Sequence, residues 1–163
     1  MVKIEILGIP KPKQSARFRI IKNKAGNQFI SSYQNKSVKD SEANIGYTAI
    51  QQLPKGFIPF DCPVSAYIEY IFPMPAGFNK IKIEAIRSGK KIYKETKPDL
   101  SDNLNKGLID ALAGIVYVND SRIVSLAAEK YYGFIPKTII LFCETSEADA
   151  IHLYNLSVKD LNK

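Results

Sequence analysis

The segment from Lys97 to Val124 (KPDLSDNLNKGLIDALAGIVYVNDSRIV) concentrates side chains that can perform chemistry. Asp99 and Asp102 open an apolar repeat, and Asp120 follows that repeat after a glycine. Carboxylate oxygens are preferred ligands of Mg²⁺ and Mn²⁺, whereas zinc favours the histidine and cysteine that this segment lacks. These residue types predict a site for a hard divalent cation, which can polarise a phosphodiester, activate water and stabilise the leaving oxygen.

Lys106 lies one helical turn beyond Asp102, where its ammonium group could neutralise charge that develops on a phosphate. Asp110 continues the same spacing of four residues. That spacing also suits a row of salt bridges on a solvated helix face, each worth about 0.3 to 0.5 kcal/mol. Spacing alone leaves a metal site and a salt-bridged helix open as alternatives.

The elements around these residues must bring them together. Leu104, Leu108 and Leu112 recur at the spacing of an amphipathic helix, which we expect to begin after Pro98 and to end at Gly114. We expect a short strand over 115–118, a turn over 119–121 and a strand over 122–132 to follow. These connections are short enough to bring the acid at the helix start and the acid of the turn to one end of a sheet.

The remaining chain shows strand and helix patterns without an internal repeat or a low-complexity linker. Alternation with period two predicts strands, and apolar residues at intervals of three and four predict helices. We expect strands over 2–7, 63–72 (buried mainly on one face) and 137–144, a hairpin over 16–22 and 28–33, and helices over 37–53, 79–87 and from Ser146. We therefore predict a single domain over residues 1–163.

The composition is that of an ordinary globular domain, with 45% hydrophobic and 24% charged residues. No apolar run approaches the roughly 20 residues that span a bilayer, and the N-terminus lacks the apolar core of a signal peptide. Cys62 and Cys143 form no metal-binding motif, so we expect both to fill core positions in a reduced compartment. These features predict a cytoplasmic protein.

The net charge of +7 is concentrated in two segments. Lys11 to Lys24 contains six basic residues and no acid, and Lys80 to Lys97 contains seven basic residues and two acids. Arg17 and Arg19 share one face of the expected hairpin, because side chains two apart in a strand point the same way. Basic segments on both sides of an acidic centre favour a nucleic acid as partner, and a solubilising surface is the alternative.

The motifs KPDLSDNLNKGLIDALAG and VYVNDSRIV, together with the opening GIPKPKQSARF, resemble the RusA family of Holliday junction endonucleases. The resemblance spans roughly residues 1–144. It implies a small α/β (α+β) RusA-like fold, with a mixed sheet, helices packed on it and a projecting basic hairpin. It also implies a homodimer, often encoded by phage, that uses Mg²⁺ to cut four-way DNA junctions by paired nicks.

Residue by residue, the family pattern implies that Asp102 and Asp120 bind the metal and that Lys106 stabilises the phosphate. The family usually places its first acid two residues before the second, whereas Asp99 and Asp102 are three apart, as if Ser101 were inserted. If the helix begins near Asp99, both acids can converge, and if it begins at Asp102, Asp99 only caps it. A second departure is Asn119, where many relatives carry another acid.

Our first hypothesis is therefore an Mg²⁺-dependent endodeoxyribonuclease (Mn²⁺ being an alternative ion) that resolves four-way junctions in DNA recombination and repair. A non-catalytic DNA-binding accessory protein and a related nuclease for flaps or single strands are the alternatives. The residues expected to act are Asp99, Asp102, Lys106 and Asp120 in catalysis, the three aspartates among them as metal ligands, and Lys11, Lys13, Arg17, Arg19 and Lys97 in DNA binding.

Overall fold

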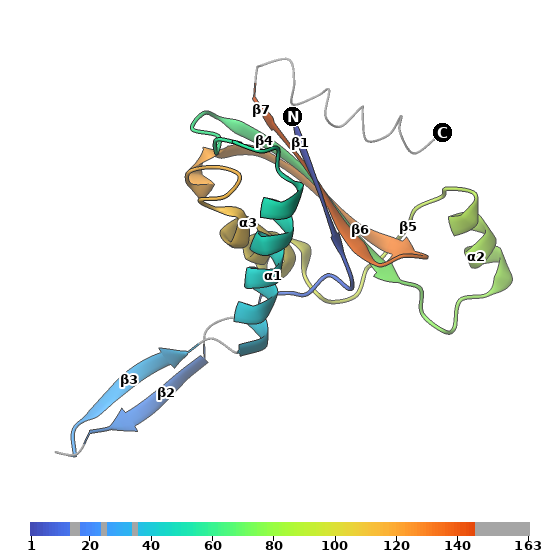
Figure 1. The fold of residues 1–163 in the computed structure, drawn as a ribbon. Coiled ribbons are helices and arrows are strands. Elements are labelled where there is room, and N and C mark those ends of the chain that lie inside the picture. The colour runs from blue at the N-terminus through green and yellow to red at the C-terminus, as the bar shows by residue number, and fades with distance from the viewer. Residues whose placement is uncertain (14–16, 24–25, 34–35, 146–163) are drawn as a thin grey trace.

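The computed structural model describes residues 1–13, 17–23, 26–33 and 36–145 of the chain (Figure 1). The helix expected from Ser146 lies outside these residues. The strands are β1 (Val2–Leu7), β2 (Arg17–Lys22), β3 (Gln28–Tyr33), β4 (Val64–Pro73), β5 (Ile92–Tyr93), β6 (Ile123–Gly133) and β7 (Lys137–Glu144). The helices are α1 (Lys36–Gln52), α2 (Lys80–Arg87), the π-helix η1 (Leu100–Asn105), α3 (Lys106–Leu112) and the 3₁₀ helix η2 (Asp120–Arg122).

Five strands form one mixed sheet in the order β1-β7-β4-β6-β5, and β2 and β3 form a separate antiparallel ribbon. β4 is antiparallel to β7 and parallel to β6. A parallel pair needs a long crossover connection, which α2, β5, η1 and α3 supply here. The structure thus confirms the predicted α+β architecture, with a mixed sheet, packed helices and a projecting hairpin.

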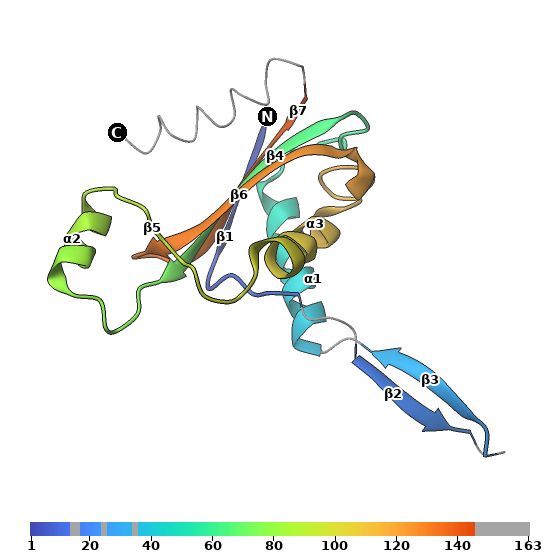
Figure 2. The same ribbon diagram turned by 180° about the vertical axis from the view of Figure 1, so that it is seen from behind.

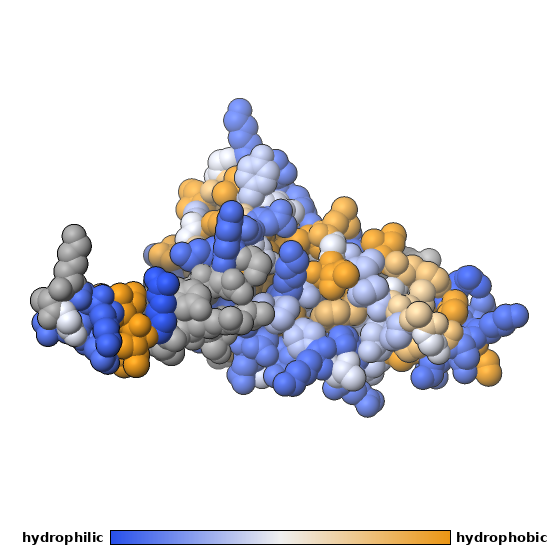
Figure 3. All heavy atoms as spheres, turned by 90° about the horizontal axis from the view of Figure 1, so that it is seen from below, coloured by the Kyte–Doolittle hydropathy of each residue, from blue (hydrophilic) through white to orange (hydrophobic). Residues whose placement is uncertain are grey.

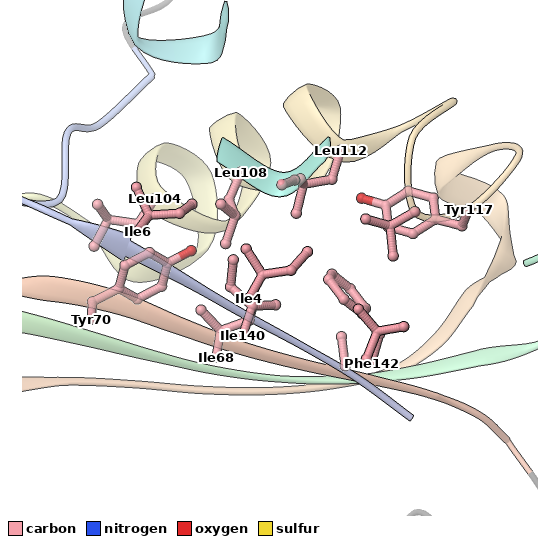
Figure 4. Close-up of a cluster of buried hydrophobic side chains, with 14 of the residues drawn as sticks. Ile4, Ile6, Ile68, Tyr70, Leu104, Leu108, Leu112, Tyr117, Ile140 and Phe142 are labelled. Atoms are coloured by element: carbon pink, nitrogen blue, oxygen red, sulfur yellow. The ribbon is translucent and has the colours of Figure 1, made fainter. Parts of the chain in front are cut away.

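The core lies between one face of the sheet and the helices α1 and α3, which cover the same side (Figure 2). Ile4, Ile140 and Ile68 are aligned across three neighbouring strands and are fully buried. The leucine stripe of η1 and α3 points at this row (Figure 4). The predicted apolar stripe is therefore the surface that fixes the acidic helix against the sheet.

β4 is buried on both faces, so the expectation of burial mainly on one face was wrong. The reason is its central place between β7 and β6, together with a polar cluster on the reverse face. In that cluster Lys91 Nζ lies 2.7 Å from Glu69 and 3.0 Å from Glu129, and the Tyr67 hydroxyl donates to Glu129 and lies 3.0 Å from Glu69. Paired charges allow polar residues to occupy a buried strand.

The strand expected over 115–118 does not form. The backbone N–H groups of Ile115 and Val116 both donate to the Leu112 carbonyl oxygen, so the chain turns tightly after α3. Only isolated bridges remain, between Tyr117 and both Phe60 and Ala113. The prediction failed because these apolar residues are buried by a turn rather than by a sheet.

The expected helix over 79–87 forms as α2, and the side chain of Asn79 accepts a hydrogen bond from the Lys82 N–H as its cap. Both cysteines are half-buried rather than fully inside the core. In the part of the chain that the structure describes, no helix is both long and apolar enough to cross a membrane.

Candidate catalytic site

The acidic helix opens with one wide turn. The Leu104 N–H donates to the Asp99 carbonyl oxygen at 3.2 Å, five residues back, which makes Leu100–Asn105 a π-helix before the regular α3 begins. Single π turns are frequent at functional sites. A π turn holds more residues than an α turn, and Ser101 and Asp102 both lie inside it.

Asp99 stands at the N-cap of this wide turn, with extended backbone angles. Its carboxylate accepts a hydrogen bond from Asn103 Nδ2 at 3.2 Å. Asp102 follows inside the same turn, and both carboxylates are exposed. The helix therefore begins beside Asp99 rather than at Asp102, and the convergence of the two carboxylates stays a prediction.

A buried hydrogen bond fixes the wide turn to the sheet. The Tyr70 hydroxyl of β4 donates to Asn105 Oδ1 at 3.0 Å, and both residues are buried. Burial raises the pKa of Tyr70, with a smaller contribution from nearby Tyr117, so the hydroxyl stays protonated and available as a donor. Sequence reasoning missed this pair, because Asn105 looks like one more polar residue of the helix.

Two lysines hold the segments beside the wide turn. Lys130 Nζ of β6 donates to the carbonyl oxygens of Thr96 at 2.9 Å and Pro98 at 2.7 Å, immediately before Asp99. On the other side, the Lys13 N–H donates to the Asn103 carbonyl oxygen at 2.8 Å. The sequence carried no signal for Lys130, which reads as an ordinary strand residue.

Within the described residues, the row of salt bridges that was one of the two alternatives for this helix does not form. Asp110 pairs instead with Lys13, at 2.7 Å, and the same ammonium group lies 2.8 Å from Glu42. Among the described residues, Asp102 and Lys106 have no ion pair, and both are exposed. Their charges are therefore open to a ligand from solution.

Lys13 is held inside the protein rather than offered to a partner. Its side chain is only 19% exposed. Burial alone would lower the pKa of Lys13, but hydrogen bonds and charge from Asp110 and Glu42 raise it above its ordinary value. Lys13 thus links the N-terminal loop, α1 and α3, and its predicted contact with DNA stays a prediction.

Asp120 lies at the other end of α3. It begins η2, and the preceding Asn119 uses its side-chain oxygen to accept the Ser121 N–H at 2.9 Å. The buried Tyr117 hydroxyl donates to the Ile109 carbonyl oxygen at 2.6 Å. Burial, followed by the charges of Asp120 and Asp110, raises the pKa of Tyr117, so this hydroxyl stays protonated and available as a donor.

One chain does not bring Asp120 beside the wide turn. Lys130, near the C-terminal end of β6, bonds to Pro98 and so lies close to Asp99. Asp120 comes just before the N-terminal end of the same strand. The intervening extended residues span roughly 25 Å. Consistently, no three His, Cys, Asp or Glu side chains of the described residues gather closely enough to hold one metal ion.

The remaining residues predicted to bind DNA lie on the surface. Lys11, Arg19 and Lys97 are exposed, and the backbone of Arg17 lies in β2 although its side chain is outside the described part. Lys11 also lines a cavity of about 270 Å³ between the N-terminal loop, α1 and Leu104 of the wide turn. Lys11 and Lys97 therefore lie beside the acidic helix, while Arg17 and Arg19 belong to the separate ribbon.

A family model described as Endodeoxyribonuclease RusA matches residues 9–141. The chain belongs to the RusA family. The match includes the ribbon, the wide turn, α3 and the Asp120 turn, so it covers all the elements that carry the predicted site. It also confirms the resemblance that the motifs indicated.

The RusA-family chain also resembles a curated protein of Bacillus subtilis (strain 168), named "Uncharacterized protein YqaN". The two are 34% identical over 85 residues, which is 52% of this chain. The matched region is 59% of the length of the Bacillus protein, so less than two thirds of that relative is covered.

Proposed function

We propose that this chain is a divalent-metal-dependent, structure-specific endodeoxyribonuclease that resolves four-way DNA junctions by paired symmetric nicks. The observation that carries the proposal is the wide turn, where exposed Asp99, Asp102 and Lys106 are free of salt bridges within the described residues. Membership of an endodeoxyribonuclease family supports the reaction class. A DNA substrate in turn implies action in the cytoplasm.

The chemical nature of the acids suits Mg²⁺ or Mn²⁺, because all the candidate donors are carboxylate oxygens. Asp99, Asp102 and Asp120 would hold the ion, which supplies Lewis-acid activation of the phosphodiester. Lys106 would place an ammonium group where negative charge develops on phosphate. In a single chain, Asp99 and Asp102 lie at the wide turn and Asp120 lies before β6. The carboxylates suit the ion chemically, but a complete site would need a second chain.

A dimer through β6 would supply that second chain. In the described residues β5 pairs with β6 only at Tyr131 and Tyr132, which leaves the segment 123–128 (IVSLAA) as an uncharged edge. Val124 and Leu126 on this segment are 60% and 41% exposed. Unpaired, uncharged edges favour pairing with another strand.

The pattern of residues favours antiparallel self-pairing centred on Ser125. Val124 would then face Leu126 of a second copy, since the side chains that meet across a twofold axis lie on the same face. In the same register, the Asp120 turn of one copy would lie near Lys130 of the other copy. Each acidic wide turn would thus receive the missing acid from the other chain.

Incubation of a four-way junction with the purified protein and Mg²⁺ tests the function directly. Wild type should introduce symmetric nicks, and Asp102→Asn or Asp120→Asn should abolish nicking while junction binding persists. Glu95→Gln, which changes an exposed acid in the loop before the site, is the matched control and should cut normally. If wild type bound the junction but did not cleave it in Mg²⁺, the proposal would be refuted.

Two other functions are separated by the same assay. A non-catalytic accessory protein would bind junctions without dependence on Mg²⁺, and the Lys13 ion pairs with Asp110 and Glu42 favour that reading for part of the acidic surface. A nuclease for flaps or single strands would cut those substrates faster than junctions in a substrate panel.

A further inference from the structure

The β2–β3 ribbon stands apart from the core. It forms a sheet of its own, and Figures 1 and 2 show it projecting beyond the end of α1. Arg17 pairs with Tyr33 at one end and Lys22 with Gln28 at the other. A two-stranded ribbon is only marginally stable alone in water, so exposed apolar residues on it call for a partner.

The charge of the chain identifies the nature of that partner. Residues 11–39 contain eight of the 23 Lys and Arg residues and none of the 16 Asp and Glu residues. This segment therefore carries +8, while the rest of the chain carries −1. Such a segment attracts a polyanion and repels its own copy.

Apolar side chains sit in the middle of this basic ribbon. Ile20 and Ile30 are directly opposite each other, so they share one face, and they are 68% and 73% exposed. Phe29, on the other face, is 49% exposed. Figure 3 shows the ribbon with apolar side chains bordered by hydrophilic ones.

We propose that the ribbon is a DNA-opening arm that inserts the Ile20–Ile30 pair between bases at the branch point of a junction. The choice of a branched substrate rests on the proposed function. A two-stranded ribbon fits the major groove, and apolar wedges are a known means of unstacking base steps. Unstacking costs least where the stack is already interrupted, as it is at a branch point.

The arm makes two kinds of contact with DNA, one to phosphates and one to bases. Exposed Lys22, together with exposed Lys11 and Lys36 of the same segment, binds phosphates and supplies most of the affinity, which falls as salt rises. The isoleucine pair supplies distortion rather than affinity. The proposal therefore predicts that binding and opening can be separated by substitution.

A junction with 2-aminopurine beside the branch point, in EDTA to prevent cleavage, measures opening directly. Wild type should raise the fluorescence severalfold at saturation. The variant carrying Ile20→Thr and Ile30→Thr, which keeps β-branched residues in both strands, should lose most of this rise. Its dissociation constant should change by less than about tenfold, since phosphate contacts remain.

Matched controls replace equally exposed isoleucines elsewhere. Ile58 and Ile81 are 82% and 79% exposed, and Ile58→Thr with Ile81→Thr should open the junction like wild type. Equal opening by the arm variant and this control would overturn the proposal. A wild-type protein that binds the junction without any rise in fluorescence would also overturn it. If the arm variant converted a dimer into monomers, the arm would instead be a contact with a second copy, and the proposal would fail.

A second measurement does not depend on loss of activity. The chain contains no tryptophan, so Ile30→Trp creates a single reporter on the arm. Junction DNA should quench this tryptophan and protect it from acrylamide, because an inserted indole stacks on bases. Ile58→Trp should keep its fluorescence, and an Ile30→Trp reporter that stays unquenched by bound junction would refute insertion.

The outcomes distinguish the arm from the nuclease. Opening without cleavage in Mg²⁺ would leave the arm proposal standing and remove the proposed function. If wild type and the double threonine variant both cleave the junction and open it equally, the proposed function stands and the arm proposal fails.

Discussion

The ammonium group of Lys130 lies 2.7 Å from the carbonyl oxygen of Pro98, the residue that precedes Asp99. This contact joins β6 to the start of the acidic helix, 32 residues earlier in the chain. Lys130 also donates to the Thr96 carbonyl oxygen, so it fixes two consecutive points of the approach to the wide turn. It thus positions Asp99 without being one of the predicted ligands.

Lys130→Met should therefore impair catalysis more than binding. Without the two hydrogen bonds the segment before Asp99 can shift, and misplacement by about 1 Å can cost about a hundredfold in rate. We expect a lower kcat on junction DNA, a higher Mg²⁺ concentration for half-maximal nicking and a nearly unchanged KM. Lys130→Arg, which keeps a donor, should restore much of the rate, and a change in KM alone would argue against positioning.

Mixing two inactive variants should recover activity if Asp120 acts in the site of the other chain. A dimer of one Asp102→Asn chain and one Asp120→Asn chain would contain one complete site and one site lacking both acids. Co-refolded mixtures should then nick one strand of a junction, while each variant alone stays inactive. Complete inactivity of a verified mixed dimer would show that each chain uses its own Asp120.

Gly107→Ala should destabilise the protein. A methyl group at this position of α3 would lie 2.9 Å from Lys13 Cβ and 3.4 Å from the Lys13 nitrogen, so the N-terminal loop must move. Overpacking costs about 1 to 3 kcal/mol, against a gain of about 1 kcal/mol in helix propensity. Urea unfolding should show a net loss of about 1 kcal/mol, and Gly77→Ala, with no atom within 4 Å, is the control.

Lys91→Met should change how stability depends on pH. Burial opposes ionisation of Glu129, but hydrogen bonds from Tyr67 and Lys91 and the charge of Lys91 lower its pKa below 4.5. A lowered pKa adds stability above 4.5 that is lost as pH falls through the folded-state value. Hydrogen bonds and charge from Glu69 and Glu129 likewise raise the pKa of Lys91 against burial, so its contribution is present below 10.5 and lost at higher pH.

The variant should accordingly be least stable, relative to wild type, between about pH 5 and 10, because two neighbouring carboxylates then lack their cation. The difference should shrink in acid as Glu129 takes up a proton. Thermal unfolding of both proteins across pH 3 to 10 measures this, and a difference independent of pH would indicate a packing effect only.

The sequence by itself determined the local elements and the family. Alternation along 2–7 and 137–144, the leucine spacing from Leu104 to Leu112 and the Asn79 cap depend on neighbours in the chain, so each element was predicted near its observed bounds. The motifs KPDLSDNLNKGLIDALAG and VYVNDSRIV, together with the opening GIPKPKQSARF, indicated an endodeoxyribonuclease, because the family signature is itself local.

Only the tertiary structure decided how the acids are placed. The π turn ends at Asn105, whose side chain bonds to Tyr70, 35 residues away, and the path of the chain separates Asp120 from that turn along β6. The short connections suggested that both acids meet at one end of a sheet, but η1 and α3 carry the chain away from Asp99 before it turns back into β6. Distances between such residues depend on the path of the whole chain, which a local pattern of residue types does not record.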